Sequence, residues 1–261
     1  IVEVTPQAQS GLSMLEVFAH EVRGMGRNEQ AASLEDGLAA DAVLAAATSK
    51  SAHGMDVHYI GFNLDMTKEF IDTCAEWAKA FSYIATDIEE FIFKEIDENG
   101  NTKEIQAFRI KFDSGFQINA LTSRPRSLRG RQGYVIIDEA AFHDDLKELM
   151  KAALALLIWG GKVLVISTHD GVANPFNEYI QAAQAGRNKY KILTTTFDDA
   201  LADGLYDRIC LTTGKEYSKE AEATWREEII NFYGEGADEE LFCVPSLSSG
   251  TFLPAVLVES R

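Results

Sequence analysis

The sequence predicts an α/β fold: a mostly parallel central sheet flanked by helices, with a β-hairpin and a short C-terminal tail. Two unbroken apolar runs, 134–137 and 163–166, are typical of parallel strands that are buried on both faces. Segments with helical spacing alternate with such strands along the chain, as in other α/β proteins. Of the 261 residues, 46% are hydrophobic, which is enough for a substantial core.

The first elements follow from local patterns. An Ala- and Leu-rich stretch over 30–47 predicts a helix, and the apolar segment 57–61 predicts a strand. Asp65 is then expected to cap a second helix. The apolar residues of that helix recur at helical spacing, and they are Phe70, Cys74, Trp77 and Phe81.

The middle of the chain carries the strongest strand signals. Segments 108–112 and 116–120 alternate between apolar and polar residues around Asp-Ser-Gly, which predicts the β-hairpin. A helix over about 144–158 separates the two apolar strands and is long enough for a crossover. Its end, 152–159, is expected to be buried.

The C-terminal part is less regular. We expect a strand over 190–196 and a helix over 219–233, with Trp225, Ile229 and Phe232 on one face. The acidic runs 87–90 and 238–240 are expected to be solvated faces. This pattern predicts one domain over 1–240, while 241–261 form a linker or the start of a further domain.

Charge and cysteine content exclude several classes of protein. The chain has 24 basic and 41 acidic residues and a net charge of −17, which argues against a protein that coats nucleic acid with its whole surface. A local basic patch remains compatible with DNA. Three scattered cysteines indicate neither a disulfide framework nor a zinc site, and no apolar run approaches the ~20 residues of a membrane span. Because the chain begins at Ile1, we expect a piece of a longer protein.

The most informative motif is VIIDE at 135–139. A buried strand that ends in Asp-Glu is the Walker B pattern of nucleoside triphosphatases. Asp138 can hold Mg²⁺, and Glu139 can polarise the water that attacks the γ-phosphate. The alternative is that both acids only cap the next helix.

Hydroxyl residues end the following strand. Ser167 and Thr168 come one βαβ unit after the Walker B pattern, where such side chains can sense a γ-phosphate. Alternatively, they only satisfy backbone groups at the end of a strand.

An arginine-rich segment precedes the Walker B strand. Four arginines fall within eight residues, and the Gly-containing loop lets the backbone approach a phosphate closely. We expect contacts with the phosphates of a nucleotide or of DNA, whereas the alternative is a solvated loop that offsets the acidic surface. The four residues are Arg124, Arg126, Arg129 and Arg131.

Together these motifs resemble the ATPase domain of phage terminase large subunits, most closely the Mu-like prophage branch. The resemblance is strongest over 57–207 and rests on ALTSRPRSLRGRQGYVIIDEAAFHDDLKELMKAAL (120–154) and GGKVLVISTHDGVANPFNEYI (160–180). It implies a P-loop NTPase or helicase-like sheet, usually followed by a nuclease domain.

The resemblance also implies roles for individual residues. It makes Asp138 the Mg²⁺-associated acid, Glu139 the catalytic base, and Ser167 with Thr168 the coupling motif. Arg124 and Arg129 are expected at nucleotide phosphates or in sensing between subunits. Arg126 and Arg131 are expected to contact DNA.

One motif departs from the family pattern. Neither Gly161-Lys162 nor Gly214-Lys215 is followed by Ser or Thr, as a phosphate-binding P-loop requires. At the expected place Gly24, Gly26 and Arg27 form at most a degenerate cradle. The carboxylates that would repel a triphosphate there are Glu29, Glu35 and Asp36.

The resemblance therefore predicts an ATPase that uses ATP and Mg²⁺ to drive double-stranded DNA into a procapsid. It implies a portal protein, a small terminase subunit and a homo-oligomeric ring on the portal as partners, in the host cytoplasm and without a membrane. Two alternatives remain: a catalytically silent ATPase-like module for assembly or DNA binding, and a helicase-type remodeller.

Overall fold

The computed structural model describes residues 2–4, 34–80, 85–96, 102–123, 128 and 130–247. These residues form two compact units: the larger contains the described residues up to Ile166, and the smaller contains 167–247. Among the described residues, no helix is long and apolar enough to cross a membrane.

The larger unit is built on a mixed sheet with the strand order β3-β4-β5-β2-β6-β7-β1. Neighbours among β5, β2, β6 and β7 are parallel, whereas β3–β4, β4–β5 and β7–β1 are antiparallel. The predicted parallel core and the hairpin formed by β4 and β5 are therefore confirmed. The strands are β1 (Val2–Val4), β2 (Val57–Gly61), β3 (Ala85–Ile96), β4 (Thr102–Phe112), β5 (Gln117–Thr122), β6 (Tyr134–Ile137) and β7 (Lys162–Val165).

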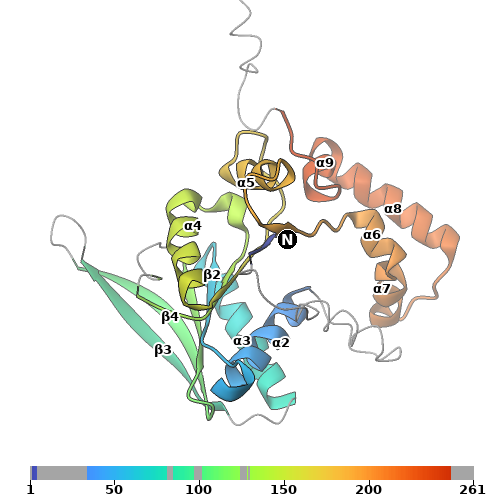
Figure 1. Cartoon of the computed structure of the whole chain (residues 1–261). Helices are drawn as coiled ribbons and strands as arrows, with labels where there is room; N and C mark the ends of the chain where they lie inside the picture. The colour runs from blue at the N-terminus through green and yellow to red at the C-terminus, as the bar shows by residue number, and fades with distance from the viewer. Residues whose placement is uncertain are drawn as a thin grey trace, which may run out of the picture. The chain divides into compact units, whose positions relative to one another are not determined.

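Helices cover both faces of this sheet (Figure 1). Helix α2 (Leu34–Ala47) packs against α3 (Leu64–Ala80), and α3 lies against β2, β4 and β5. Helix α4 (Leu146–Leu154) continues into the 3₁₀ helix η4 (Ala155–Trp159) and lies on the opposite face. The helices predicted over 30–47 and 144–158 are thus confirmed within the described residues.

The start of α3 differs from the prediction. The side chain of Asn63, not Asp65, accepts the hydrogen bond from the first helical turn, at 2.9 Å from the Met66 nitrogen. Asn63 precedes the helix by one residue, which is where a capping side chain can reach that turn. The predicted apolar spacing is confirmed by Phe70 and Cys74, both fully buried, whereas Phe81 lies outside the described residues.

The order of the strands produces a topological switch point. After β2 and α3, the next parallel strand is β5, which lies on the side of β2 away from β6. After β6 and α4, the chain continues into β7, which lies on the side of β6 away from β2. Right-handed crossovers in opposite directions place their helices on opposite faces, as observed. Ligands of open α/β sheets bind outside the carboxyl ends of the strands at such a point, which here lies between β2 and β6.

The arginine-rich segment is the connection from β5 to β6. In the sheet, β2 lies between these two strands. The described residues Leu128 and 130–132 line a cavity with residues of α4, which lies on the face opposite α3. On that face His58 of β2 bonds the carbonyl of Gln132 through Nε2, at 3.0 Å. Leu128 is fully buried. The segment is therefore anchored in the core as well as charged.

His58 is a neutral core residue. Its Nδ1 accepts from the Asn119 amide at 3.4 Å, so its Nε2 carries the proton that is donated to Gln132. Burial lowers the pKa of His58 to about 4. Both ring nitrogens are occupied, which leaves neither for a metal ion.

The sequence missed one strand and overestimated another. The long strand β3, which pairs with β4, was not predicted. The acidic run 87–90 lies within β3, and its expected solvation stays a prediction. Of the strand expected over 190–196, only β8 (Lys191–Ile192) forms. Thr196 instead caps α6 (Phe197–Ala202), since its side chain and that of Asp199 bond each other's backbone nitrogens in a capping box.

The smaller unit is mainly helical. Leu201, Tyr206 and Cys210 form its buried cluster, against which Trp225 and Phe197 pack. The predicted helix over 219–233 is confirmed. The helices are α5 (Pro175–Gln184), α6 (Phe197–Ala202), α7 (Leu205–Thr213), α8 (Lys219–Tyr233) and α9 (Ala237–Glu240).

Candidate active site

Asp138 lies at the carboxyl end of β6, at the switch point of the sheet. Its backbone nitrogen donates to the Ile60 carbonyl at 3.0 Å, which continues the pairing of β6 with β2. Its carboxylate accepts from the Tyr59 hydroxyl at 2.7 Å and from the Glu139 nitrogen at 3.0 Å, one bond on each oxygen. Since a carboxylate oxygen accepts two hydrogen bonds, each retains capacity for a water molecule or a cation.

Packing fixes Tyr59. Its ring stacks on Phe70 of α3, with the ring centroids 3.8 Å apart and the planes within 6°. Tyr59 is only 2% exposed, so its hydroxyl has a defined direction toward Asp138. Tyr59 was not among the predicted site residues, although a tyrosine on a buried strand signals that its hydroxyl has a polar partner.

Glu139 has an unusual backbone. Its φ of 51° and ψ of 46° lie in the left-handed helical region. For a residue with a side chain this conformation costs about 1–2 kcal/mol, and such strain clusters at functional sites. The turn leads into the 3₁₀ helix η3 (Ala140–Phe142), whose first nitrogen donates to Ile166 at 3.0 Å.

His143 turns back toward the same loop. Its Nε2 lies 2.7 Å from the carbonyl oxygen of Asp138, and its Nδ1 bonds the hydroxyl of Ser123. The side chain is buried, and burial lowers its pKa although the carbonyl of Asp138 and the carboxylates of Asp138 and Asp144 oppose the shift. Ser123 directly follows β5, so the carboxyl ends of β5 and β6 are joined through this ring.

Two aromatic side chains border the turn. Phe62, directly after β2, and Phe142, in η3, are 46% and 37% exposed and make an edge contact at 6.4 Å between centroids. Phe62 also contacts the His143 ring edge-on.

Comparison with known proteins identifies relatives of the chain. No protein-family model matches it. The chain is 48% identical over 223 residues to the Mu-like prophage FluMu protein gp28 of Haemophilus influenzae, covering 85% of this chain and 43% of that protein. It is also 48% identical over 222 residues to the probable terminase large subunit gp28 of Escherichia phage Mu, covering 84% and 40%.

The chain is a homologue of the gp28 proteins of phage Mu and of a Mu-like prophage, the first of which is named a probable terminase large subunit. It spans less than half the length of these relatives. Among solved structures, the ATPase domain of the Thermus phage P74-26 large terminase is similar over 56% of the chain and 59% of that domain, with a TM-score of 0.34 and 18% identity. A likeness of this level supports no conclusion about the site.

The structure of this terminase homologue brings together only part of the predicted site. Asp138 and Glu139 lie together, and Ser167 with Thr168 follows β7, the strand beside β6. The residues that lie outside the described part of the chain are Gly24, Gly26, Arg27, Arg124, Arg126 and Arg129. Their roles remain predictions.

Arg131 lies at the other end of β6 from Asp138. It interacts with Asp56, which precedes β2, and its charge lowers the pKa of that carboxyl while burial raises it to a larger extent. The structure thus separates Arg131 from the Walker B acids. Its expected contact with DNA remains a prediction.

The predicted contact with Mg²⁺ depends on one carboxylate, that of Asp138. Among the described residues, no group of three or more His, Cys, Asp or Glu side chains is arranged to hold a metal ion. Mg²⁺ does not require such a group, because it usually binds one or two carboxylates together with water and substrate phosphates. The open acceptor positions of Asp138 fit this mode.

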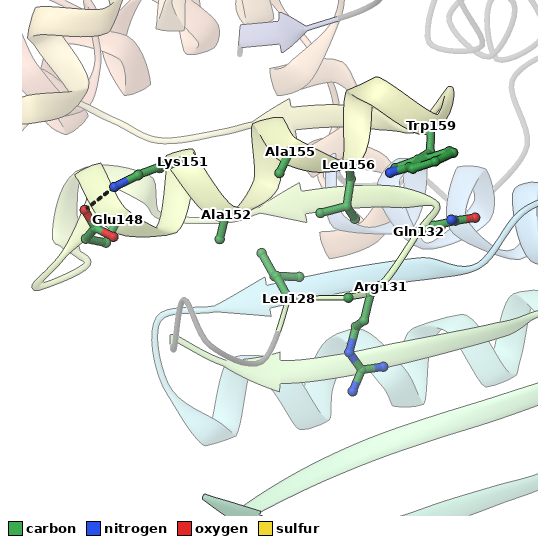
Figure 2. A pocket seen from close by; sticks show the side chains of 10 residues that line it. Leu128, Arg131, Gln132, Glu148, Lys151, Ala152, Ala155, Leu156 and Trp159 are labelled. Atoms are coloured by element: carbon green, nitrogen blue, oxygen red, sulfur yellow. Dashed lines mark hydrogen bonds and ion pairs between the residues drawn. The ribbon is translucent and has the colours of Figure 1, made fainter. Parts of the chain in front are cut away.

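A cavity of about 460 Å³ lies between the arginine-rich segment and α4–η4, and it does not include the Walker B acids (Figure 2). Leu128 and Leu156 form part of its wall, and the pair Lys151–Glu148, at 3.3 Å, lies at one end. Trp159 at the other end is 74% exposed. The prediction of a buried helix end over 152–159 is confirmed for Ala152, Ala153 and Leu156, but it is wrong for Ile158 and Trp159, because η4 ends at the surface.

In the smaller unit, Glu239 binds the loop that follows the predicted coupling motif. Its Oε1 accepts from the nitrogens of Gly171 and Ser246. Burial acts to raise the pKa of Glu239, but these two hydrogen bonds and the nearby His169 outweigh it and lower the pKa. The prediction that 238–240 is a solvated face was wrong for this residue.

Proposed function

We propose that the chain is the ATPase part of a phage DNA-packaging motor. The observation that carries the proposal is the Asp138–Glu139 turn at the carboxyl ends of β2 and β6, in a homologue of the Mu-type terminase large subunits. A P-loop NTPase-like sheet places its acids at this position. The arrangement suits hydrolysis of a phosphate anhydride.

The two acids take different roles. Asp138 would hold Mg²⁺, which supplies positive charge at the β- and γ-phosphates when it is bound. Tyr59 and the Glu139 nitrogen orient the Asp138 carboxylate. Glu139, on its left-handed turn, accepts a proton from the attacking water and orients it.

The surrounding residues supply contacts for phosphate. Ser167 and Thr168 couple hydrolysis to motion, while Arg126 and Arg131 grip double-stranded DNA. Contacts with the nucleotide phosphates come from Arg124, Arg129, Gly24, Gly26 and Arg27. The partners that this role requires are the portal protein, the small terminase subunit and further copies of the chain in a ring, in the host cytoplasm at the procapsid portal.

The substitution Glu139→Gln tests the proposal. It removes the base but preserves the shape of the side chain, so we expect ATP binding within about threefold of wild type and turnover reduced about 10²–10⁴-fold. Phosphate release and calorimetric titration with Mg-ATP measure the two quantities. Glu148→Gln, on α4, is the matched control and should hydrolyse ATP normally. Undiminished turnover in Glu139→Gln would contradict the assignment.

The missing P-loop pattern favours a second candidate, the catalytically silent module. A ligand that binds only the folded state stabilises that state by mass action, by about 2.7 kcal/mol at a ligand concentration of 100 times Kd. The melting temperature rises as a result. Thermal melting with and without millimolar Mg-ATP separates the two candidates. An unchanged melting temperature in both wild type and Glu139→Gln supports the silent module.

A further inference from the structure

We propose that His143 is a positioning residue of the nucleotide site, which fixes the Asp138–Glu139 turn through the carbonyl oxygen of Asp138. The inference deepens the proposed ATPase function and rests on it. His143 bonds the backbone carbonyl of Asp138, so its effect on the reaction passes through the backbone.

The peptide group between Asp138 and Glu139 determines where the base points. Rotation of this peptide plane changes ψ of Asp138 and φ of Glu139 together, and φ of Glu139 is at 51°. A left-handed conformation persists only where neighbouring contacts over-determine it. The His143 ring supplies such a contact, at 2.7 Å from the oxygen of this peptide group.

The partners of the ring define its tautomer. A carbonyl oxygen can only accept, so Nε2 of His143 carries the proton and donates it to Asp138. In a neutral imidazole Nδ1 is then an acceptor, and the Ser123 hydroxyl donates to it. The ring is 5% exposed and the edge of Phe62 packs against it, so its orientation is fixed on several sides.

His143 also connects the turn to the arginine-rich segment. Ser123 is the residue directly before Arg124, and its hydroxyl ends the chain of hydrogen bonds from the Asp138 carbonyl. The sequence allows two explanations for His143 beside Asp144 and Asp145: contact with the active site, or an acid-rich start of α4. The structure assigns that capping role to Asp145, whose side chain accepts from the Glu148 nitrogen.

Three substitutions in the 261-residue chain test the inference. In His143→Gln the amide nitrogen can occupy the position of Nε2 and donate to Asp138, whereas the shorter side chain of His143→Asn cannot reach it. We expect His143→Asn to lower kcat for ATP about 10–100-fold, the range for partners that orient catalytic groups, with KM within about threefold. His143→Gln should recover most of this loss. Ser123→Ala should lower kcat by a smaller factor.

Leu149→Ala is the control for lost stability. Leu149 is fully buried in α4 and lies outside the hydrogen-bond chain. This variant should melt at a lower temperature but keep the wild-type kcat at a temperature where it is folded. A kcat of folded His143→Asn within twofold of wild type would overturn the inference, as would equal losses in the Gln and Asn variants.

A second measurement needs no nucleotide. The ¹⁵N chemical shifts of the histidine rings should show His143 as the neutral tautomer with its proton on Nε2, with a change at Nδ1 in Ser123→Ala. A proton on Nδ1 would overturn the inference whether or not the chain hydrolyses ATP. Normal turnover in Glu139→Gln would instead overturn the proposed function, so the two failures give different results.

Discussion

At the scale of single residues, the pairing of β6 with β2 requires Gly133 to lie very close to the backbone of Asp56. A β-carbon there would lie 2.1 Å from the carbonyl oxygen of Asp56, and φ is +126°. The contact exists because the Tyr134 nitrogen donates to that same oxygen at 2.8 Å, which aligns β6 with the start of β2. Only glycine fits this position.

Gly133→Ala should therefore be far more destabilising than Gly130→Ala. Gly130 also has a positive φ, +79°, but nothing lies within 4 Å of its missing β-carbon. We expect a loss of about 1–2 kcal/mol at Gly130 from backbone strain, and a further loss of about 1–3 kcal/mol at Gly133 from the displaced strand. Urea unfolding measures both. Equal losses would contradict the close approach seen at Gly133.

Residue types also show what could be predicted about the site. The Asp-Glu pair was found because an apolar strand that ends in acids has few structural explanations. The left-handed turn at Glu139 and the Tyr59–Asp138 hydrogen bond were not predicted. A tyrosine on a buried strand signals a polar partner, but the identity of that partner depends on how the strands are ordered in the sheet.

At the scale of elements, the short helix α9 is linked to the loop after β7 by one carboxylate. Glu239 accepts hydrogen bonds from Gly171 and Ser246, and the nitrogen of Val172 donates to the carbonyl of Ser246 at 2.9 Å. Two of these bonds tie the loop that follows Ser167 and Thr168 to residues 239 and 246, and the third joins Glu239 to Ser246. Protonation of Glu239 would weaken two of them.

This linkage predicts an acid-sensitive contribution to stability. Because folding lowers the pKa of Glu239 from its ordinary value of 4.5, its contribution is fully present above pH 4.5 and is lost as the pH falls through the folded pKa. Glu239→Gln should therefore lower the melting temperature at pH 7 and lose less stability than wild type as the pH falls below 4.5. Glu240→Gln, on the same helix, is the control. A parallel decline in Glu239→Gln and wild type would contradict the linkage.

Elements differed in how far the sequence predicted them. The buried strands β6 and β7 were predictable because both of their faces are apolar. The hairpin β3–β4 was missed because charged residues interrupt its alternation, although Asn99-Gly100 is a strong turn signal. The strand expected over 190–196 failed because Thr196 and Asp199 favour a helix start over extension.

At the scale of the whole molecule, the charge of −17 and the arginine-rich segment have compatible roles. Arg131 lies next to Asp56, and Leu128 anchors the segment in the core. A basic segment held on a rigid sheet can contact phosphate locally while the acidic remainder limits non-specific binding. Such local contacts would suit the proposed motor, which has to release DNA at each step.

The two compact units predict unfolding in two steps. The larger is built on a sheet with buried strands, whereas α8 of the smaller has no buried residue and its cluster is limited to Leu201, Tyr206 and Cys210 with their neighbours. Since stability follows buried apolar area, the smaller unit should unfold first. Calorimetry should give a total enthalpy larger than the van't Hoff enthalpy of a single transition.

The tryptophans assign the steps to the units. Trp225 lies in the cluster of the smaller unit, whereas Trp77 and Trp159 lie in the larger. In Trp77→Phe/Trp159→Phe, fluorescence reports only the smaller unit and should change at a lower urea concentration than far-UV circular dichroism. Trp225→Phe, the complementary variant, should show the later transition. Coincident transitions in both variants would mean that the units unfold as one, because each fluorophore then follows the same cooperative event.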